Sequence, residues 1–348
     1  MDASTSASAA LWVVFMLVLI ALAFDFMNGF HDAANSIATI VSTGVLRPGQ
    51  AVVFAGFFNF IAYFIFGLTV AATIGKGIVS PNVVDTHVVF GALVGALTWN
   101  VVTWYYGIPS SSSHALVGGI VGATIAKAGA GVLIAGGVLK IVAFIFISPL
   151  LAFSMGSLTL VLVTWIFRRF RPSRIDRWFR RLQLLSAASS SLGHGGNDAQ
   201  KTVGIVWLLL IAATDSKVQG LPPWMMASKD HLPGWVVVAC YLTIAVGTMS
   251  GGWRIVRTMG QRITKLRPVT GFCAEAGSAA TLFLATLLGI PVSTTHAITG
   301  AIVGVGSTRR ASAVRWGVAG NIVWAWVLTI PASAFVAAIA YWISNQLY

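Results

Sequence analysis

Two stretches of the chain repeat one pattern, in which a proline is followed by hydroxyl side chains, a histidine and a glycine-spaced apolar run. Residues 107–123 read GIPSSSSHALVGGIVGA and residues 289–305 read GIPVSTTHAITGAIVGV, with ten of the seventeen aligned positions identical. Proline suits the first turn of a helix, and the residues after it present free N–H groups at the positive end of the helix dipole. Two such helix starts facing each other would form a cage for an anion, with these candidate ligands: Ser111, Ser112, Ser113, Ser293, Thr294 and Thr295. The alternative interpretation is that each hydroxyl-rich start only caps its own helix.

A second pair of stretches, GFHDAANSIATI and GGNDAQKTVGIV, places charged and amide side chains inside apolar segments. Asp32 and Asn35 are three residues apart and share one helix face, as do Asp198 and Lys201. Because a charge in hydrocarbon is costly, these groups indicate a functional site. Asp32 and Asn35, with the freed carbonyls of a broken helix, would suit a small hard cation. Lys201 replaces Asn35 in the second copy, where it can fill a cation site, pair with Asp198 or reach an anion.

Glu275 is the only glutamate of the chain, and it lies in an apolar stretch where the repeat aligns it with Leu93. It is a candidate proton or cation site; the alternative is a glutamate hydrogen-bonded at a helix crossing or near the cytoplasmic surface. Importing an anion against an inside-negative potential costs about 2.3 kcal/mol per charge per 100 mV, so such a transporter needs a coupling ion. The candidate coupling residues are Asp32, Asn35, Asp198 and Glu275. Four histidines adjoin the motifs: His31, His114, His194 and His296. They can carry protons near neutral pH, but we favour a packing role for His114 and His296.

The composition predicts an all-α polytopic membrane protein. Hydrophobic residues make up 57% of the 348 residues and charged residues only 9%, against roughly 25% charged in soluble domains; the mean hydropathy is +0.85. The net charge of +13 does not indicate nucleic-acid binding, because sixteen of the 22 Lys and Arg cluster in a few short segments. Such clusters are typical of cytoplasmic loops facing anionic membrane lipid. The two cysteines support neither a disulfide nor a metal framework.

The apolar runs predict which segments position the motifs. In the first half we expect a span broken near its middle at 11–45, spans at 51–74 and 86–106, a half-helix at 109–126, and either one helix or two pieces meeting near Pro149 at 131–167. In the second half we expect a span at 182–213, broken at 193–201, and further spans at 234–252, 268–288 and 316–343. An outer loop at 214–233 and a basic loop at 254–267 connect the first three of these spans, and a half-helix at 291–306 precedes the last.

The two halves carry the motifs in the same order, but the first half begins outside the membrane and the second begins inside. This arrangement predicts an inverted-topology repeat, whose broken helices and re-entrant half-helices meet near the bilayer midplane. The N-terminal repeat covers 1–167, a basic cytoplasmic linker covers 168–181, and the C-terminal inverted repeat covers 182–348.

NGFHDAANSIAT and GHGGNDAQKTVGIV resemble the two signature motifs of the inorganic phosphate transporter (PiT) family, and GIPSSSSHA and GIPVSTTHA resemble its paired phosphate-binding segments. The similarity extends over residues 11–343, and the motif forms are most similar to those of bacterial low-affinity Pit-type phosphate permeases. The resemblance implies symport of phosphate with protons, as a neutral complex with a divalent metal, through a multi-pass protein of the bacterial inner membrane. It implies phosphate contacts from the six cage hydroxyls, with Asp32, Asn35 and Asp198 nearby; we add Lys201 to this substrate-binding set. We expect no cofactor and no resident metal, and a homodimer is compatible with the sequence.

Two departures from the family pattern bear on the coupling ion. Sodium-coupled relatives usually carry Asn three residues after each Asp, whereas this chain has Lys201 in the second motif and His31 in place of an Asn in the first. We therefore favour protons, with a sodium-coupled phosphate symporter or a sulfate permease as alternatives. Carboxylates beside the anion site argue against an anion channel. The chain is not expected to be an enzyme, because Ser113 and His114 are adjacent on one helix and do not face each other.

Overall fold

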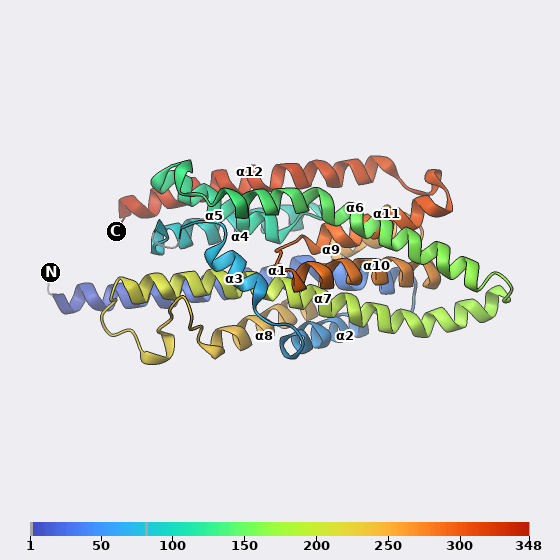
Figure 1. Ribbon diagram of the computed structural model, residues 1–348, viewed down its shortest axis with the longest axis horizontal. Helices are drawn as coiled ribbons and strands as arrows, with labels where there is room; N and C mark the ends of the chain where they lie inside the picture. Colours follow the sequence, from blue (N-terminus) through green and yellow to red (C-terminus); the bar gives the residue numbers. More distant parts are fainter. Residues whose placement is uncertain (1–2, 81–82, 348) are drawn as a thin grey trace.

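The computed structural model describes residues 3–347 apart from 81–82, and in this part of the chain twelve α-helices form an elongated bundle (Figure 1). The first half contains α1 (Ala3–Ser42), α2 (Pro48–Ile61), α3 (Thr69–Lys76), α4 (Thr86–Tyr106), α5 (Ser112–Ala128) and α6 (Ala135–Ile166). The second half contains α7 (Pro172–Asp215), α8 (Gly234–Ser250), α9 (Trp253–Arg257), α10 (Pro268–Leu287), α11 (Thr294–Arg309) and α12 (Trp316–Leu347).

Five of the described helices are long and apolar enough to cross a membrane: α1 from Ala10, α4, α6, α10 and α12. A sixth span is possible if α8 and the helical segment 253–262 cross the membrane together; the axes of these two segments meet at a bend of 61°. Large apolar side chains such as Leu139, Leu150 and Trp342 are more than 60% exposed on the outside of α6 and α12. An apolar exterior of this kind suits lipid, so the prediction of an all-α polytopic membrane protein is confirmed.

The elements of the two halves correspond closely. α4, α5 and α6 have counterparts in α10, α11 and α12 that begin 181 or 182 residues later. α5 packs against α4 and α12, and α11 packs in the equivalent way against α10 and α6. α1 and α7 run in opposite directions along the bundle (Figure 1). The inverted membrane orientation of the two halves, and their boundaries, stay predictions.

α1 and α7 are not broken where we predicted, because both are helical through their polar segments. The glycines in these segments serve a close approach between helices instead. A Cβ atom on Gly29 would lie 2.3 Å from the carbonyl oxygen of Ile244 in α8, and one on Gly195 would lie 2.4 Å from the carbonyl oxygen of Asn59 in α2. The polar side chains find partners on neighbouring helices, so the backbone does not need to open. A cation here would have side-chain ligands and not freed carbonyls.

Three other expectations about the elements change. The single span expected at 51–74 is two short helices, α2 and α3, joined by a 3-10 turn at Ala62–Phe64 and a short non-helical stretch. The segments expected as basic loops at 168–181 and 254–267 are largely helical: α7 begins at Pro172, and α9 leads into a π-helical turn at Thr258–Arg262. Proline at a first helical position followed by arginines, which are good helix formers, explains the first of these. The segment 131–167 contains one helix, α6, with Pro149 inside it.

α5 has 17 residues and α11 has 16. At about 1.5 Å per residue both are shorter than the hydrocarbon core of about 30 Å. Their lengths agree with half-helices, and the predicted re-entrant path stays a prediction. Gly107 and Gly289 precede the two helices with φ values of +66° and +65°, a left-handed conformation that glycine adopts without strain. The chain therefore makes the same sharp turn before both hydroxyl motifs.

Candidate functional site

One hydroxyl of each motif caps its own helix. Ser111 is the N-cap of α5 and Ser293 is the N-cap of α11, and each Oγ accepts a hydrogen bond of 3.2 Å from the backbone N–H three residues later. The capping interpretation therefore describes these two hydroxyls. The N–H groups of the next two residues precede the first intrahelical bond of each helix and point out of its end.

One hydroxyl from each helix start, Ser113 of α5 and Thr294 of α11, contacts a single ion pair. Lys201 Nζ pairs with Asp198 Oδ1 and donates a hydrogen bond to Ser113 Oγ of α5. Thr294 Oγ1 of α11 donates to Asp198 Oδ2 at 2.8 Å. Ser112 is fully buried, and its Oγ has no hydrogen-bond partner among the described residues. The ends of two helices that lie 182 residues apart in sequence thus converge on one point of α7.

Asn35 and Lys201 complete this convergence from α1 and α7. Asn35 Nδ2 donates to Thr294 Oγ1 and to Thr295 Oγ1, both at 3.0 Å. Lys201 Nζ also donates to the carbonyl oxygen of Val292, at 2.6 Å. Of the three roles left open for Lys201, the structure shows the ion pair with Asp198. Its ammonium also lies among oxygen atoms that would otherwise be open to a cation.

Asp32, His194 and Asp198 form a cluster on the other side of the ion pair. One ligand atom of each residue lies within 4.8 Å of the other two, and all three side chains are buried. His194 Nε2 is 3.2 Å from Asp198 Oδ2, although the geometry is not that of a hydrogen bond. His31 Nδ1 is 2.7 Å from Asp32 Oδ1. Two carboxylates and an imidazole are a donor set that fits a divalent cation.

The assembled site is closed to solvent and brings two carboxylates together with one ammonium group and two imidazoles. All ten predicted substrate-binding residues are at most 4% exposed. Two carboxylates, Asp32 and Asp198, face a single ammonium group on Lys201. Because unpaired charge is costly in a buried site, this balance favours a further cation or proton together with any anion.

Glu275 lies outside the cage, at the crossing of α10 with α1 and α7. Its Oε1 accepts one hydrogen bond from Thr39 Oγ1 and a second from Gln183 Nε2, the second at 3.0 Å. Its Oε2 accepts a hydrogen bond from Ser186 Oγ at 2.5 Å. Thr39 is one helical turn beyond Asn35 on α1. The hydrogen-bonded alternative is thus what the structure shows, and a coupling role for Glu275 stays a prediction.

This polar group has no counterpart in the other half. The positions equivalent to Glu275 and its three donors are all apolar and lie in one hydrophobic core cluster or pack against it: Leu93, Ile205, Leu17 and Ile20. The two halves therefore share the helix arrangement at this crossing but differ in the polarity of the side chains that meet there.

Sequence reasoning missed two residues that shape the site. Asn197 accepts from the Val292 N–H at 3.3 Å and donates to the Ile290 carbonyl oxygen at 3.2 Å, so its amide holds the turn before α11. Asp25 is fully buried and accepts a hydrogen bond of 2.7 Å from Thr202. Its position seven residues before Asp32, two turns along one helix face, is the signal that could have found it.

The two motif histidines pack against each other. The rings of His114 and His296 meet edge to face with centroids 4.6 Å apart, and the His296 ring stacks on Trp326 at 3.7 Å. This geometry agrees with the packing role that we favoured for them.

Comparison with known proteins adds the family. The model of the phosphate transporter family matches residues 28–337. A protein of Rhizobium meliloti named as a probable low-affinity inorganic phosphate transporter is 57% identical over 94% of this chain and 96% of its own length. One of the same name from Bacillus subtilis is 44% identical over 96% of this chain and 97% of its own length.

A solved structure, named as the sodium-dependent phosphate transporter, superposes with a TM-score of 0.87 at 25% identity. It covers 97% of this chain and is itself covered completely. These relatives are transporters and not enzymes, and the family predicted from the four motifs is confirmed. With this fold and with family similarity over nearly its whole length, the chain belongs to the phosphate transporter family.

Proposed function

We propose that the chain is a secondary active symporter that imports inorganic phosphate across a bacterial inner membrane by alternating access. Protons are the coupling ion, and a divalent metal travels with the phosphate as cargo. The observation that carries the proposal is the convergence of two helix N-termini on the buried pair Asp198–Lys201. The names of the relatives support phosphate as the substrate. A homodimer stays a prediction.

Phosphate would be held by donors from three sides. The free N–H groups of the two helix starts and the hydroxyls of Ser112, Ser113 and Thr295 supply uncharged donors. Thr294 joins them by turning its hydroxyl from Asp198 to the phosphate. Lys201 supplies the positive charge by redirecting part of its bonding from Asp198 to the substrate. A protonated phosphate can donate a hydrogen bond to a carboxylate, which sulfate cannot do. Acceptors in the cage therefore favour phosphate over sulfate.

The choice of protons over sodium rests on Lys201. Its fixed ammonium takes the place of the amide that Asn35 provides in the first half, and it lies among the oxygen atoms of Asp198, Ser113 and Val292. This half of the site has less room for a metal coupling ion. Sodium is the alternative, because the solved relative is named as a sodium-dependent transporter.

We expect phosphate uptake into proteoliposomes to follow a proton gradient. With the interior alkaline and sodium absent, radiolabelled phosphate should accumulate above equilibrium, because each bound proton offsets the charge of the anion. A sodium gradient at equal pH on both sides is the control, and it should drive no accumulation. Uptake that follows sodium and ignores pH would exclude proton coupling but would leave phosphate transport standing.

The acidic cluster makes a separate prediction about the cargo metal. Replacing Asp32→Asn should lower the uptake of a radiolabelled divalent metal together with phosphate at least about tenfold, because metal sites lose that much when a ligand shell is disturbed. The matched control is Asp85→Asn, which removes a half-exposed carboxylate that pairs with Lys127 and caps α4. Equal metal uptake by both variants would contradict a metal site at Asp32, His194 and Asp198.

A further inference from the structure

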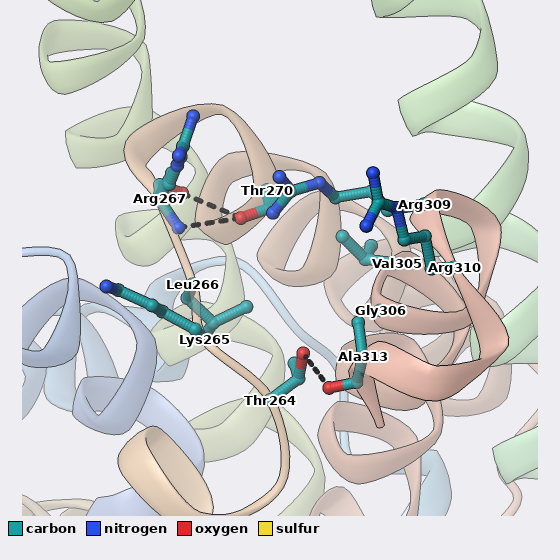
Figure 2. Close-up of a pocket in the computed structure, with 10 residues that line it drawn as sticks. All are labelled: Thr264, Lys265, Leu266, Arg267, Thr270, Val305, Gly306, Arg309, Arg310 and Ala313. Atoms are coloured by element: carbon teal, nitrogen blue, oxygen red, sulfur yellow. Dashed lines mark hydrogen bonds between the residues drawn. The ribbon is translucent and has the colours of Figure 1, made fainter. Parts of the chain in front are cut away.

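A cationic cavity of about 670 Å³ lies far from the cage, between the start of α10 and the end of α11 (Figure 2). Its rim carries Lys265 and Arg267 from the α10 side and Arg309 and Arg310 from the α11 side, all exposed. In the part of the chain that the structure describes, none of these four forms an ion pair with a carboxylate. The cavity is therefore a strongly positive site with no internal anion.

The walls of this cavity are fixed by hydrogen bonds. Thr264 Oγ1 donates to the carbonyl oxygen of Ala313 at 3.0 Å, which ties the segment before α10 to the turn after α11 (Figure 2). Thr270 Oγ1 accepts from the backbone N–H of Arg267 at 2.8 Å. Both threonines are buried. These bonds fix the backbone on both sides of the cavity whose rim carries the four cations.

A second cavity adjoins the first. A groove of about 960 Å³ shares Arg267, Thr270 and Arg309 with the first cavity and extends between α6 and the start of α7. Among the described residues that line the groove, Asp176 is the one carboxylate, and it pairs with Arg180 at 2.9 Å. Three residues therefore belong to a polar cavity on one side and to a groove along a membrane helix on the other.

The wall of the groove on α6 is apolar and faces outward. Val161 and Trp165 are 52% and 63% exposed there, and Leu160, which is buried, lies at the base of the groove. Only 17% of the most apolar window of α6 is buried within the protein, the smallest share among the five candidate spans. The Arg168 guanidinium lies 5.4 Å over the Trp165 ring. Tryptophan and arginine side by side at the end of an apolar helix are typical of the membrane–water interface.

We infer that the joined cavity and groove form a specific binding site for an anionic phospholipid. The headgroup phosphate lies between Arg267 and Arg309, and an acyl chain follows Leu160, Val161 and Trp165 along α6. Free phosphate would use the cations alone, whereas a phospholipid uses both halves of the site. The site joins α6, α10 and α11, so a bound lipid fixes the relative positions of the helices that carry the cage and Glu275.

The test is the binding of phosphatidylglycerol to the purified full-length protein. Native mass spectrometry counts the lipid molecules retained, and a thermal melt records the rise in Tm that the lipid produces. Replacing Arg267→Gln together with Arg309→Gln should weaken binding about 30-fold, the factor expected for two cation contacts with an anionic lipid. The control is Arg174→Gln with Arg177→Gln, which removes the same charge at the same end of the bundle but outside both cavities; it should bind like the unaltered protein.

Two further measurements distinguish the binding of a lipid from the binding of free phosphate. Val161→Gln, on the apolar wall, should weaken phosphatidylglycerol binding severalfold, and inorganic phosphate at millimolar concentration should not displace the lipid. Equal binding by the arginine pair and its control would overturn the inference, as would displacement of the lipid by inorganic phosphate. Because these measurements record lipid binding and not transport, their outcome is independent of the proposed transport function.

Discussion

Removing two hydroxyls, by Ser112→Ala with Thr294→Val, is expected to abolish phosphate binding at micromolar to millimolar concentrations while the helical bundle stays folded. Each hydroxyl lies at the start of one of the two converging helices, and each would hydrogen-bond a charged ligand. Such bonds contribute about 1.5–3 kcal/mol each, so losing two should weaken binding at least about a hundredfold. Binding of radiolabelled phosphate to the purified protein measures the loss, and circular dichroism monitors the fold.

The control for this variant removes hydroxyls from the same two helices, away from their starts. Thr124 on α5 and Thr299 on α11 are buried, and their Oγ1 atoms have no partner within the described chain. Changing both to valine should leave phosphate binding within about twofold, since valine keeps the shape of threonine and removes hydroxyls that lie away from the cage and make no hydrogen bond. If the Ser112 and Thr294 variant binds phosphate as well as this control, the cage hypothesis is wrong.

The second large effect is expected from replacing Lys201, which stands where the first half of the repeat has Asn35. Lys201→Asn should give the second half the same Asp–Asn arrangement as the first and leave Asp198 without its ammonium partner. A buried carboxylate without a partner costs several kcal/mol, and a sodium ion can relieve that cost. We expect proton-driven uptake to fall at least about tenfold and uptake driven by a sodium gradient to appear.

The comparison for this variant is Lys127→Asn. Lys127 also pairs with an aspartate, Asp85, but that pair is partly exposed and far along α5 from the cage. Its loss should change neither the driving ion nor the rate by more than about twofold, because exposed pairs contribute little. Sodium-independent uptake by the Lys201→Asn protein at the unaltered rate would show that Lys201 does not determine the coupling ion.

The sequence predicted which polar residues meet better than it predicted the helices that carry them, while their role in binding stays a prediction. Aligning the two halves was enough to select Ser113, Thr294, Asn35, Asp198 and Lys201, which the structure joins by direct hydrogen bonds and an ion pair. Repetition was the signal, because an internal repeat of polar residues inside an apolar chain is hard to explain by packing alone. The bounds of α4 and α10 were also close to the prediction, since both are uniform apolar runs.

The interruption of α1 and α7 was predicted wrongly for a physical reason. A glycine with nearby polar residues in an apolar run can mark a broken helix or a close helix contact, and only the partner decides between them. The partners of Gly29 and Gly195 are carbonyl oxygens of α8 and α2, more than a hundred residues away in sequence. The same limit applies to Glu275, whose isolation was evident but whose donors Thr39 and Gln183 come from other helices.

The polar group around Glu275, with its apolar counterpart around Leu93, makes the two halves of the carrier chemically unequal. A carrier whose halves were chemically identical would have outward-open and inward-open forms of equal energy, and it would release substrate equally well on both sides. A carboxylate present in one half only removes that degeneracy. We therefore expect influx and efflux through this protein to differ in their apparent affinity for phosphate, although the helices of the two halves are arranged almost symmetrically.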